Sequence, residues 1–528
     1  MHRRSYFTYP IWAGISILLI ACLFLPLLIL LTFFFIPGGE AWASILEYSL
    51  PGQTSNTILL LCMVVPASIA IGTWLAWLVS VYDFRSRKIL EWALILPLTF
   101  PTYIMAFTQA QMFSYGGLLS KVSKLAGAEK AWHFDILNLP GLALVLTFSL
   151  YPYVYLPVRL AFRAGIGPYL ESARMLGKNN NATFFRIAAP LARPAIIGGA
   201  FLVAMEVLND YGAVKYYGIS TLTTGIFSAW FSSNDLTSAI RIALFLLIFV
   251  LIAIGTERLL RKNKRFISAR KQSPPFRESL NGSKRIVYPA VALSLLFIAF
   301  ILPLYQVITD AFKNLDLINS KQFIEMSINS LLLAFSGAII VIILSFIVIF
   351  GQRINDNKLL NLLSRSFAIG YALPGAVIAV AVMLISSRID DALGSYLIGG
   401  SIAGLLFAFT VRFIAIGYNN LSSGFERQAK NSENAALSLG QSPSKTLFKV
   451  NIPISKRILL AAFILAFVDM AKELPLTLIL RPFNFHTFST KAFEYASDEM
   501  LAKAALPSLF IILLGALPVI LLNRSLRN

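Results

Sequence analysis

Long apolar runs alternate with short polar segments along the whole chain. The apolar residues lie in uninterrupted stretches such as 12–36 and 287–308, without the two-residue alternation of a half-buried strand. A run of about 20 apolar residues is long enough to cross the hydrocarbon layer as a helix. Because only helices or closed barrels satisfy their backbone inside a bilayer, the pattern predicts an all-α polytopic membrane protein. We expect twelve spans, at residues 11–36, 57–81, 89–113, 140–163, 195–214, 237–258, 287–309, 330–351, 360–386, 398–418, 458–480 and 504–523.

Composition supports this interpretation and excludes a soluble protein. Charged residues make up 13% of the 528 residues and the mean hydropathy is +0.73, whereas soluble domains carry about 25% charged residues. The formal net charge of +20 comes from basic residues gathered in particular loops, which is typical of membrane topology and disfavours nucleic-acid binding. The two cysteines, Cys22 and Cys62, both lie in apolar runs, so neither a disulfide framework nor a metal cluster is expected.

The positions of the basic residues predict the orientation of the spans. Arg3 and Arg4 precede the first span, loop 37–56 has no Lys or Arg, and segment 258–285 has ten basic residues and one acidic residue. Both termini and the loops that follow even-numbered spans are therefore expected in the cytoplasm. One outer loop, with Lys121, Lys124 and Lys130, departs from the rule. The first apolar run is longer than that of a signal peptide and is interpreted as a retained helix.

The chain divides near its middle into two related halves. Segment 259–286 has the Ser, Pro, Gly and basic composition of a linker. Asn56-Thr57 before the second span matches Asn329-Ser330 before the eighth, and Pro101 matches Pro374 at the same offset. We predict a parallel repeat of six-span domains, at 1–258 and 287–528, joined by a cytoplasmic linker at 259–286.

Two polar loops repeat the same pattern 263 residues apart. They read ESARMLGKNNNATFFRIAAP at 171–190 and NAALSLGQSPSKTLFKVNIP at 434–453, each with Gly and Pro 13 residues apart. A short helix is predicted before Gly177 (169–176) and before Gly440 (433–439), and each glycine can adopt the positive φ that ends a helix. A second short helix follows, capped by Ser442 with Pro443 at its first position, and by Asn181 in the first copy. Pro190 and Pro453 predict a turn into the next span.

This paired pattern resembles the EAA loop of bacterial ABC-importer permeases, which reads Glu-Ala-Ala, three residues, Gly, nine residues, Ile-x-Leu-Pro. The resemblance implies a MetI-like fold, no ATPase site in this chain, and loops that dock on two copies of a cytoplasmic ATPase which uses ATP and Mg. It assigns this coupling role to Glu171, Ala173, Gly177, Ile187, Pro190, Asn434, Ala435, Ala436, Gly440, Val450 and Pro453. The copies depart from the pattern where Asn434 replaces the glutamate, with Glu433 one position early, and where Ser172 and Ala189 stand for Ala and Leu.

Four acidic residues are candidates for the substrate path. Glu206 and Asp210 are four residues apart, as are Asp469 and Glu473, so each pair shares one helix face. The pairs also correspond in the repeat, and acids at membrane depth usually face a bundle interior or a water path. Two structural interpretations stay open: Lys472 could neutralise Asp469 and Glu473, and Asp210 could lie at the outer surface.

The segments around these acids resemble the fused two-domain ferric-iron permeases of Gram-negative bacteria over essentially the whole chain. The resemblance is carried by EVLNDYGAVKYYG, TLTTGIFSAW and KELPLTLILRPFNFHTFSTKAFEYASDE. It implies an inner-membrane protein that receives Fe(III) from a periplasmic binding protein. Fe(III) is a hard cation that suits carboxylate oxygens, although the residues that contact it are left open.

Other functions are weighed against this one. The chain has no P-loop, no HExxH pattern, and only the scattered histidines His2, His133 and His486, which disfavours an enzyme and places ATP hydrolysis on a partner. A permease of the same architecture for thiamine or another small solute is the nearest alternative. An ion-coupled secondary transporter is further away, because it does not need two EAA-like loops.

Overall fold

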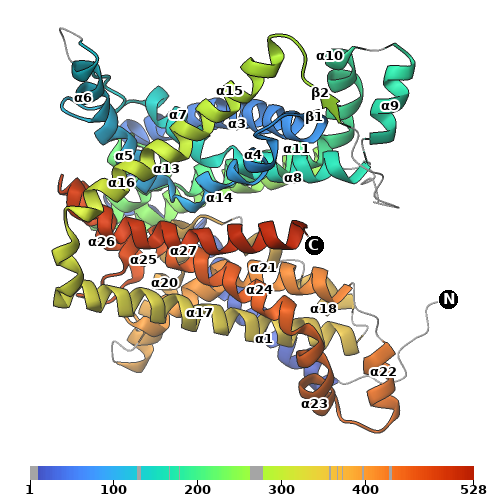
Figure 1. Ribbon diagram of the computed structural model, residues 1–528. Coiled ribbons are helices and arrows are strands. Elements are labelled where there is room, and N and C mark those ends of the chain that lie inside the picture. Colours follow the sequence, from blue (N-terminus) through green and yellow to red (C-terminus); the bar gives the residue numbers. More distant parts are fainter. Residues whose placement is uncertain are drawn as a thin grey trace. The chain divides into compact units, whose positions relative to one another are not determined.

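The computed structural model describes residues 10–527 except 128–131, 166, 178, 262–276, 356–357, 365–366, 371–372, 395–397 and 427–430. Apart from two strands of two residues each, the regular structure in these residues is helical, which confirms the all-α fold (Figure 1). The chain forms two compact units. We call residues 41–233, 245–316 and 491–528 the N-unit, and residues 1–40, 234–244 and 317–490 the C-unit.

The N-unit contains most of the first half of the chain and the first and last helices of the second half. Its elements in the first half are α2 (Trp42–Ser44), η1 (Ile45–Ser49), α3 (Leu50–Val81), β1 (Tyr82–Asp83), α4 (Arg87–Ala93), η2 (Leu96–Thr99), α5 (Thr102–Phe113), α6 (Leu118–Leu125), α7 (Leu139–Leu150), α8 (Pro152–Gly165), α9 (Gly167–Met175), α10 (Asn180–Thr183), η3 (Phe184–Ala188), α11 (Ala189–Asn209), α12 (Gly212–Tyr216), α13 (Leu222–Phe227) and η4 (Ser228–Ser232). They are joined by most of α14 (Leu236–Arg261) and by β2 (Glu278–Ser279), α15 (Lys284–Leu296), η5 (Phe297–Ile301), α16 (Leu302–Phe312) and α27 (Leu501–Arg527).

The C-unit contains the middle of the second half together with the first helix of the chain. Its elements are α1 (Pro10–Thr32), α17 (Lys321–Ile354), α18 (Lys358–Ser364), α19 (Phe367–Gly370), α20 (Gly375–Leu393), α21 (Ile402–Glu426), α22 (Asn431–Ser438), α23 (Pro443–Thr446), η7 (Leu447–Asn451), α24 (Ile452–Ala471) and α25 (Pro475–Leu480). Two further elements, η6 (Leu315–Asn319) and α26 (Phe488–Ser497), cross the division between the units.

Equivalent helices form the centre of each unit. In the N-unit α3 packs along α8 and α11, and in the C-unit α17 packs along α21 and α24. The first helix of each half also packs on helices of the other half: α1 packs on α17 and α20 in the C-unit, and α16 packs on α5 in the N-unit. The repeat seen in the sequence is therefore a repeat of packing, with the first helices exchanged.

Nine helices in the described residues are long and apolar enough to cross a membrane, or ten when one bent pair is included. That pair, Arg87–Thr99 with Thr102–Leu125, bends by 97° just after Pro101, where the third span was predicted. The two other predicted spans, 360–386 and 458–480, overlap α20 and α24. Charged residues lower the apolar character of these two helices: Arg388, Asp390 and Asp391 on α20, and Lys456, Arg457 and Asp469 on α24.

The C-terminal end of the predicted linker is fixed to the N-unit. β2 pairs in parallel with β1, with Tyr82 opposite Glu278 and Asp83 opposite Ser279. The next residue, Leu280, is buried. Most of the predicted linker, residues 262–276, lies outside the described residues.

Candidate coupling loops and membrane-path acids

Each polar loop has a helix that ends in a glycine of left-handed conformation. α9 is followed by Gly177 with φ +67°, and α22 by Gly440 with φ +77°. No atom lies within 4 Å of the position that a Cβ would take at either glycine. The glycines are therefore required by backbone conformation and not by lack of space.

The second short helix of each loop begins with a side-chain cap. In the C-unit the Ser442 hydroxyl accepts a hydrogen bond from the backbone N–H of Lys445 at 3.3 Å, with Pro443 at the first helical position, as predicted. In the N-unit the cap is Asn179, whose Oδ1 accepts from the backbone N–H of Ala182 at 2.8 Å. The prediction of Asn181 was wrong, because α10 begins at Asn180 and Asn181 lies inside it.

The predicted turn at Pro190 and Pro453 was also wrong. In both loops the short helix passes through one turn of π-helix, η3 or η7, directly into the membrane helix α11 or α24. Each proline is the second residue of the membrane helix and directly follows the π-turn, so its missing N–H falls where the regular i→i−4 hydrogen bonding is already interrupted. Each loop is thus continuous with the helix that follows it.

The repeat-related residues of the two loops have matching exposure. Ala173 and Ala436 are buried, Ile187 and Val450 are half-buried, and Glu171 and Asn434 are exposed. The same pattern reveals four exposed apolar side chains that the motif does not contain: Leu176 and Leu439 are 77% and 82% exposed, and Phe185 and Phe448 are 72% and 67% exposed. They were not singled out in the sequence, although apolar residues at matching places in two polar loops were a usable signal.

The two loops differ in how they are attached to their units. In the C-unit, Glu433 of α22 forms an ion pair with Arg353 at the end of α17, with Nε and Oε1 2.5 Å apart, and accepts a hydrogen bond from Asn451 of η7 at 3.2 Å. The corresponding positions in the N-unit are Leu170 and Ala188, both buried. The inward face of the loop is therefore ionic in one unit and apolar in the other.

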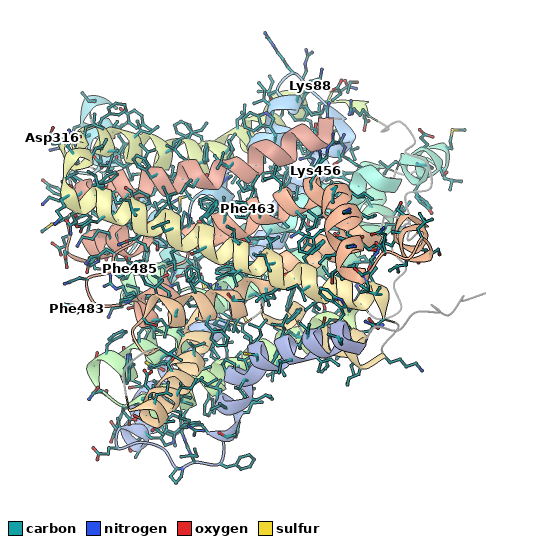
Figure 2. All side chains as sticks on the ribbon, turned by 90° about the horizontal axis from the view of Figure 1, so that it is seen from below. Lys88, Asp316, Lys456, Phe463, Phe483 and Phe485 are labelled. Atoms are coloured by element: carbon teal, nitrogen blue, oxygen red, sulfur yellow. The ribbon has the colours of Figure 1, made fainter. Side chains whose placement is uncertain are left out.

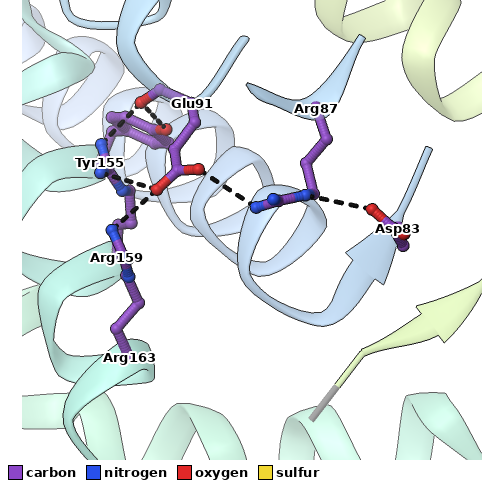
Figure 3. A network of polar contacts seen from close by, with 6 residues as sticks. All are labelled: Asp83, Arg87, Glu91, Tyr155, Arg159 and Arg163. Carbon is purple, nitrogen blue, oxygen red and sulfur yellow. Dashed lines mark hydrogen bonds and ion pairs between the residues drawn. The ribbon is translucent and has the colours of Figure 1, made fainter. Parts of the chain in front are cut away.

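The N-unit instead has an ionic network on the helix that leads into α9 (Figure 3). Glu91 of α4 forms ion pairs with Arg87, with Arg159 at 3.0 Å and with Arg163 at 2.8 Å, the last two on α8. The backbone carbonyl of Glu91 also accepts hydrogen bonds from Arg159 and from the Tyr155 hydroxyl. The network ties the end of α8, two residues before α9 begins, to α4.

The candidate path acids mark the points where the two loop-connected helices end. α11 ends at Asn209, and buried Asp210 accepts hydrogen bonds from the backbone N–H groups of Ala213 and Val214 in α12. α24 ends at Ala471, and buried Glu473 accepts from the backbone N–H of Leu476 in α25 at 3.1 Å. Since Asp210 is buried, it does not lie at the solvent surface of the N-unit.

The break after α24 lies far from the coupling loop. Figure 2 shows Lys456 near the loop end of α24, Phe463 further along it, and Phe483 and Phe485 at the opposite end of the C-unit. A helix of 20 residues is about 30 Å long. One continuous helix therefore separates the coupling loop from Glu473, which follows its end.

Glu473 is neutralised by a residue that was not predicted. Arg412 of α21 lies 3.4 Å from its carboxylate, and both side chains are less than a tenth exposed. A Cβ at Gly375, the first residue of α20, would lie 2.2 Å from Arg412 Nη1 and 2.8 Å from Glu473 Oε1. Lys472 pairs with Asp469 at 2.7 Å instead, and the hydroxyl of Tyr153 donates to Glu206 at 3.2 Å.

The paired asparagines found in the sequence have the same role in both units. Asn56 donates to the carbonyl of Ser220, and the adjacent Thr57 accepts from the backbone N–H of Leu222. Asn329 likewise donates to the carbonyl of His486, and Ser330 accepts from the N–H of Phe488. These bonds fix the segments that follow the path acids. Among the described residues, no group of three or more His, Cys, Asp or Glu side chains could hold a metal ion.

Comparison with known families fits this duplicated architecture. The profile of the family described as "Binding-protein-dependent transport system inner membrane component" matches residues 68–265 and 356–527, once in each half of the chain. The chain belongs to this family. It is a multi-pass membrane permease of an ABC importer, a class in which ATPase and substrate-binding partners are the rule.

Curated relatives match the permease over different lengths. It is 25% identical to the Fe(3+)-transport system permease protein FbpB 2 of Haemophilus influenzae over 89% of each chain. It is 28% identical to a probable molybdenum ABC transporter permease of Haloferax volcanii, over 46% of this chain and 87% of that one. It is 30% identical to the sulfate transport system permease protein CysT of Salmonella typhimurium, over 28% of this chain and 50% of that one.

Proposed function

We propose that this permease carries Fe(III) from a periplasmic binding protein into the cytoplasm, driven by two copies of a partner ATPase that uses ATP and Mg. The observation that carries the proposal is the similarity to an Fe(3+) permease over 89% of both chains. The sulfate and molybdenum relatives correspond to at most about half of this chain. A relative that corresponds to nearly the whole chain is a better guide to the substrate than one that corresponds to half of it or less.

The charges of the candidate path residues support a cationic substrate. The candidate path residues are carboxylates in both units: Glu206 and Asp210 in the N-unit, and Asp469 and Glu473 in the C-unit, where Lys472 pairs with Asp469 and Arg412 with Glu473. Asp210 accepts hydrogen bonds from the backbone N–H groups of Ala213 and Val214, which are neutral. Carboxylate oxygens suit a hard cation better than an oxyanion such as sulfate or molybdate.

The coupling loops provide the contact through which the ATPase would act. We assign this role to the predicted loop residues and to the exposed apolar side chains Leu176, Phe185, Leu439 and Phe448. Closure of the ATPase dimer would move both loops, and the continuous helices α11 and α24 would carry the movement to Asp210 and Glu473. The proposed location is the inner membrane, with both loops and both termini in the cytoplasm.

The test is uptake by proteoliposomes that contain the permease, its ATPase and its binding protein. We expect ATP-dependent uptake of Fe(III), and no uptake of thiamine, sulfate or molybdate. Uptake of one of the other solutes with ATP would overturn the iron assignment. Uptake driven by an ion gradient without ATP would overturn the importer mechanism itself.

The candidate path acids are tested in the same system. Glu206→Ala and Asp469→Ala are expected to lower iron uptake while ATPase assembly is retained. Glu325→Ala is the matched control, because Glu325 is an acid on the exposed first turns of α17. Normal iron uptake by both path variants would reduce these acids to structural roles.

A further inference from the structure

Five exposed basic side chains surround the β1–β2 pair of the N-unit. Arg85 follows β1, Lys88 lies in the first turn of α4, Arg277 precedes β2, and Lys284 and Arg285 begin α15, which packs on α4. None of the five forms an ion pair with a described residue. The nearby carboxylates of Asp83 and Glu91 are already occupied by Arg87, Arg159 and Arg163. Glu278 in β2 is the one further acid in these segments, so basic side chains outnumber acidic ones on this surface.

Arg277, beside β2, is partly buried and lies near both basic and acidic side chains. Partial burial and the charges of Arg87 and Arg163 lower the pKa of the Arg277 guanidinium, and Asp83 and Glu91 only partly oppose them. Arg277 nevertheless stays protonated, since an arginine loses its proton only far above neutral pH. A bound anion would offset both the partial burial of this cation and its repulsion by Arg87 and Arg163.

Apolar and aromatic side chains accompany the basic ones. Ile89 of α4 and Ile286 and Val287 of α15 are at least half exposed. Tyr288 packs edge-on against Tyr82 and Trp74, with ring centroids 6.2 and 6.0 Å apart. Tyrosine and tryptophan gather where a membrane meets water, and lysine and arginine extend from that level to the headgroups. A soluble anion would need the basic groups alone.

We propose that this surface binds the phosphate headgroup of an anionic phospholipid in the cytoplasmic leaflet. Basic residues beside a membrane helix recognise such headgroups, and arginine can contact a phosphate with two N–H groups at once. The proposal rests on the orientation proposed above, which puts the coupling loops in the cytoplasm. Figure 1 shows β1 and β2 at the same end of the N-unit as α9 and α10.

A bound headgroup would hold together three segments that are far apart in the sequence. Arg85 and Lys88 belong to the first half, Arg277 to the end of the linker, and Lys284 and Arg285 to the first helix of the second half. The lipid would also neutralise charge beside the Glu91 network, which ties the end of α8 to α4. It would therefore stabilise the end of the N-unit from which the coupling loop extends.

The test measures lipid binding to the full-length permease in neutral detergent by native mass spectrometry. Phosphatidylglycerol and phosphatidylcholine are compared, with inorganic phosphate in a separate thermal-unfolding assay. The variant is Arg85→Gln/Lys88→Gln/Arg277→Gln. The control, Lys121→Gln/Lys124→Gln/Lys503→Gln, removes three exposed lysines from the same unit on its predicted outer side. Monodispersity in gel filtration shows that each variant is folded.

Phosphatidylglycerol is expected to bind the wild type and the control alike, and the variant at least about tenfold more weakly, because three charges contribute to headgroup affinity. Phosphatidylcholine should not distinguish the three proteins. The proposal would be overturned if the variant and the control bound phosphatidylglycerol with equal affinity. It would also be overturned if inorganic phosphate alone raised the unfolding temperature of the wild type as much as phosphatidylglycerol does. A variant that loses co-purifying ATPase but keeps phosphatidylglycerol would reassign the surface to the ATPase. None of these outcomes depends on which solute is transported.

Discussion

The coupling loop of the C-unit directs its acidic residue inward, whereas the loop of the N-unit directs its own outward. Glu433 is held by Arg353 and Asn451, and Asn434 is the exposed neighbour. In the N-unit Leu170 takes the inward position, and Glu171 is exposed. The second copy has therefore not simply lost the glutamate of the EAA pattern. Its acid lies one residue earlier, where it anchors the loop to its own unit and leaves the exposed position uncharged.

A similar contrast exists at the far ends of α11 and α24. Asp210 and Glu473 both cap the short helix that follows the break. Among the described residues, Glu473 forms an ion pair with Arg412, whereas Asp210 forms none. The residue after the repeat-related prolines, Pro101 and Pro374, differs accordingly, with Thr102 in the N-unit and Gly375 in the C-unit. In the C-unit, buried ion pairs therefore hold the coupling loop and the end of α24. In the N-unit, the ionic network lies on α8, the helix that precedes the coupling loop.

The largest effect on folded yield is expected from exchanging Thr102 and Gly375, the residues after Pro101 and Pro374. In Gly375→Thr, the new Cβ would clash with both partners of the buried ion pair, Arg412 Nη1 and Glu473 Oε1. Breaking a buried ion pair costs about 3–5 kcal/mol, so the variant should lose most of its folded yield in gel filtration. Thr102→Gly adds no atoms and should remain folded. Comparable yields for the two variants would contradict the role given to Gly375.

The next effect concerns the anchor of the C-unit loop. Arg353→Met leaves Glu433, which is only 13% exposed, without its cation, and should destabilise α22 locally by about 2 kcal/mol. Hydrogen exchange in residues 431–438 should accelerate, and co-purification of the ATPase should fall. Glu171→Gln, in the exposed position of the other loop, should change neither. If α22 exchanges at the wild-type rate in Arg353→Met, the ion pair does not anchor the loop.

A smaller effect, equal in both units, is expected at the loop glycines. Gly177→Val and Gly440→Val place a β-branched residue at φ +67° and +77°, at a cost of about 1–2 kcal/mol each. Transport and ATPase assembly should fall more than membrane insertion, measured as protein yield in the membrane fraction. Unequal effects would show that the two loops contribute unequally to coupling, and unchanged uptake in both variants would remove the assigned role.

The smallest effect is expected from restoring the motif in the second loop. Asn434→Glu changes an exposed side chain and should alter stability by less than about 0.5 kcal/mol. Because Glu433 remains bound to Arg353, thermal unfolding should match the wild type. ATPase affinity can then be compared directly with that of Glu171→Asn, which makes the opposite exchange. A large loss of stability would mean that Asn434 also supports the fold.

The sequence was sufficient for features that depend on neighbouring residues. The helical fold, the glycines that end α9 and α22, and the cap at Ser442 follow from periodicity and local hydrogen bonding. The path from η3 and η7 into α11 and α24 was missed, because a proline signals a turn or a first helical turn equally well. Asn179 was missed for a similar reason, since three consecutive asparagines all suit a cap.

Contacts between distant segments were beyond the sequence. Arg412 and Glu473 are 61 residues apart, and Arg353 and Glu433 are 80 apart, so no spacing connects them. The exchange of α1 and α15–α16 between halves depends on packing that a linear boundary does not encode. The repeat itself was nevertheless visible, because Asn56 and Asn329 make the same bond at the same place in each unit.

The composition of the N-unit also constrains how the protein is made. Residues 491–528, with α27, belong to the same compact unit as residues 41–233. During synthesis the helices in residues 41–233 can therefore complete their packing only after α27 has been inserted. A nascent chain that stalls after its first half would expose the surfaces that pack against α16 and α27. Insertion of α27 would thus control when the N-unit is complete.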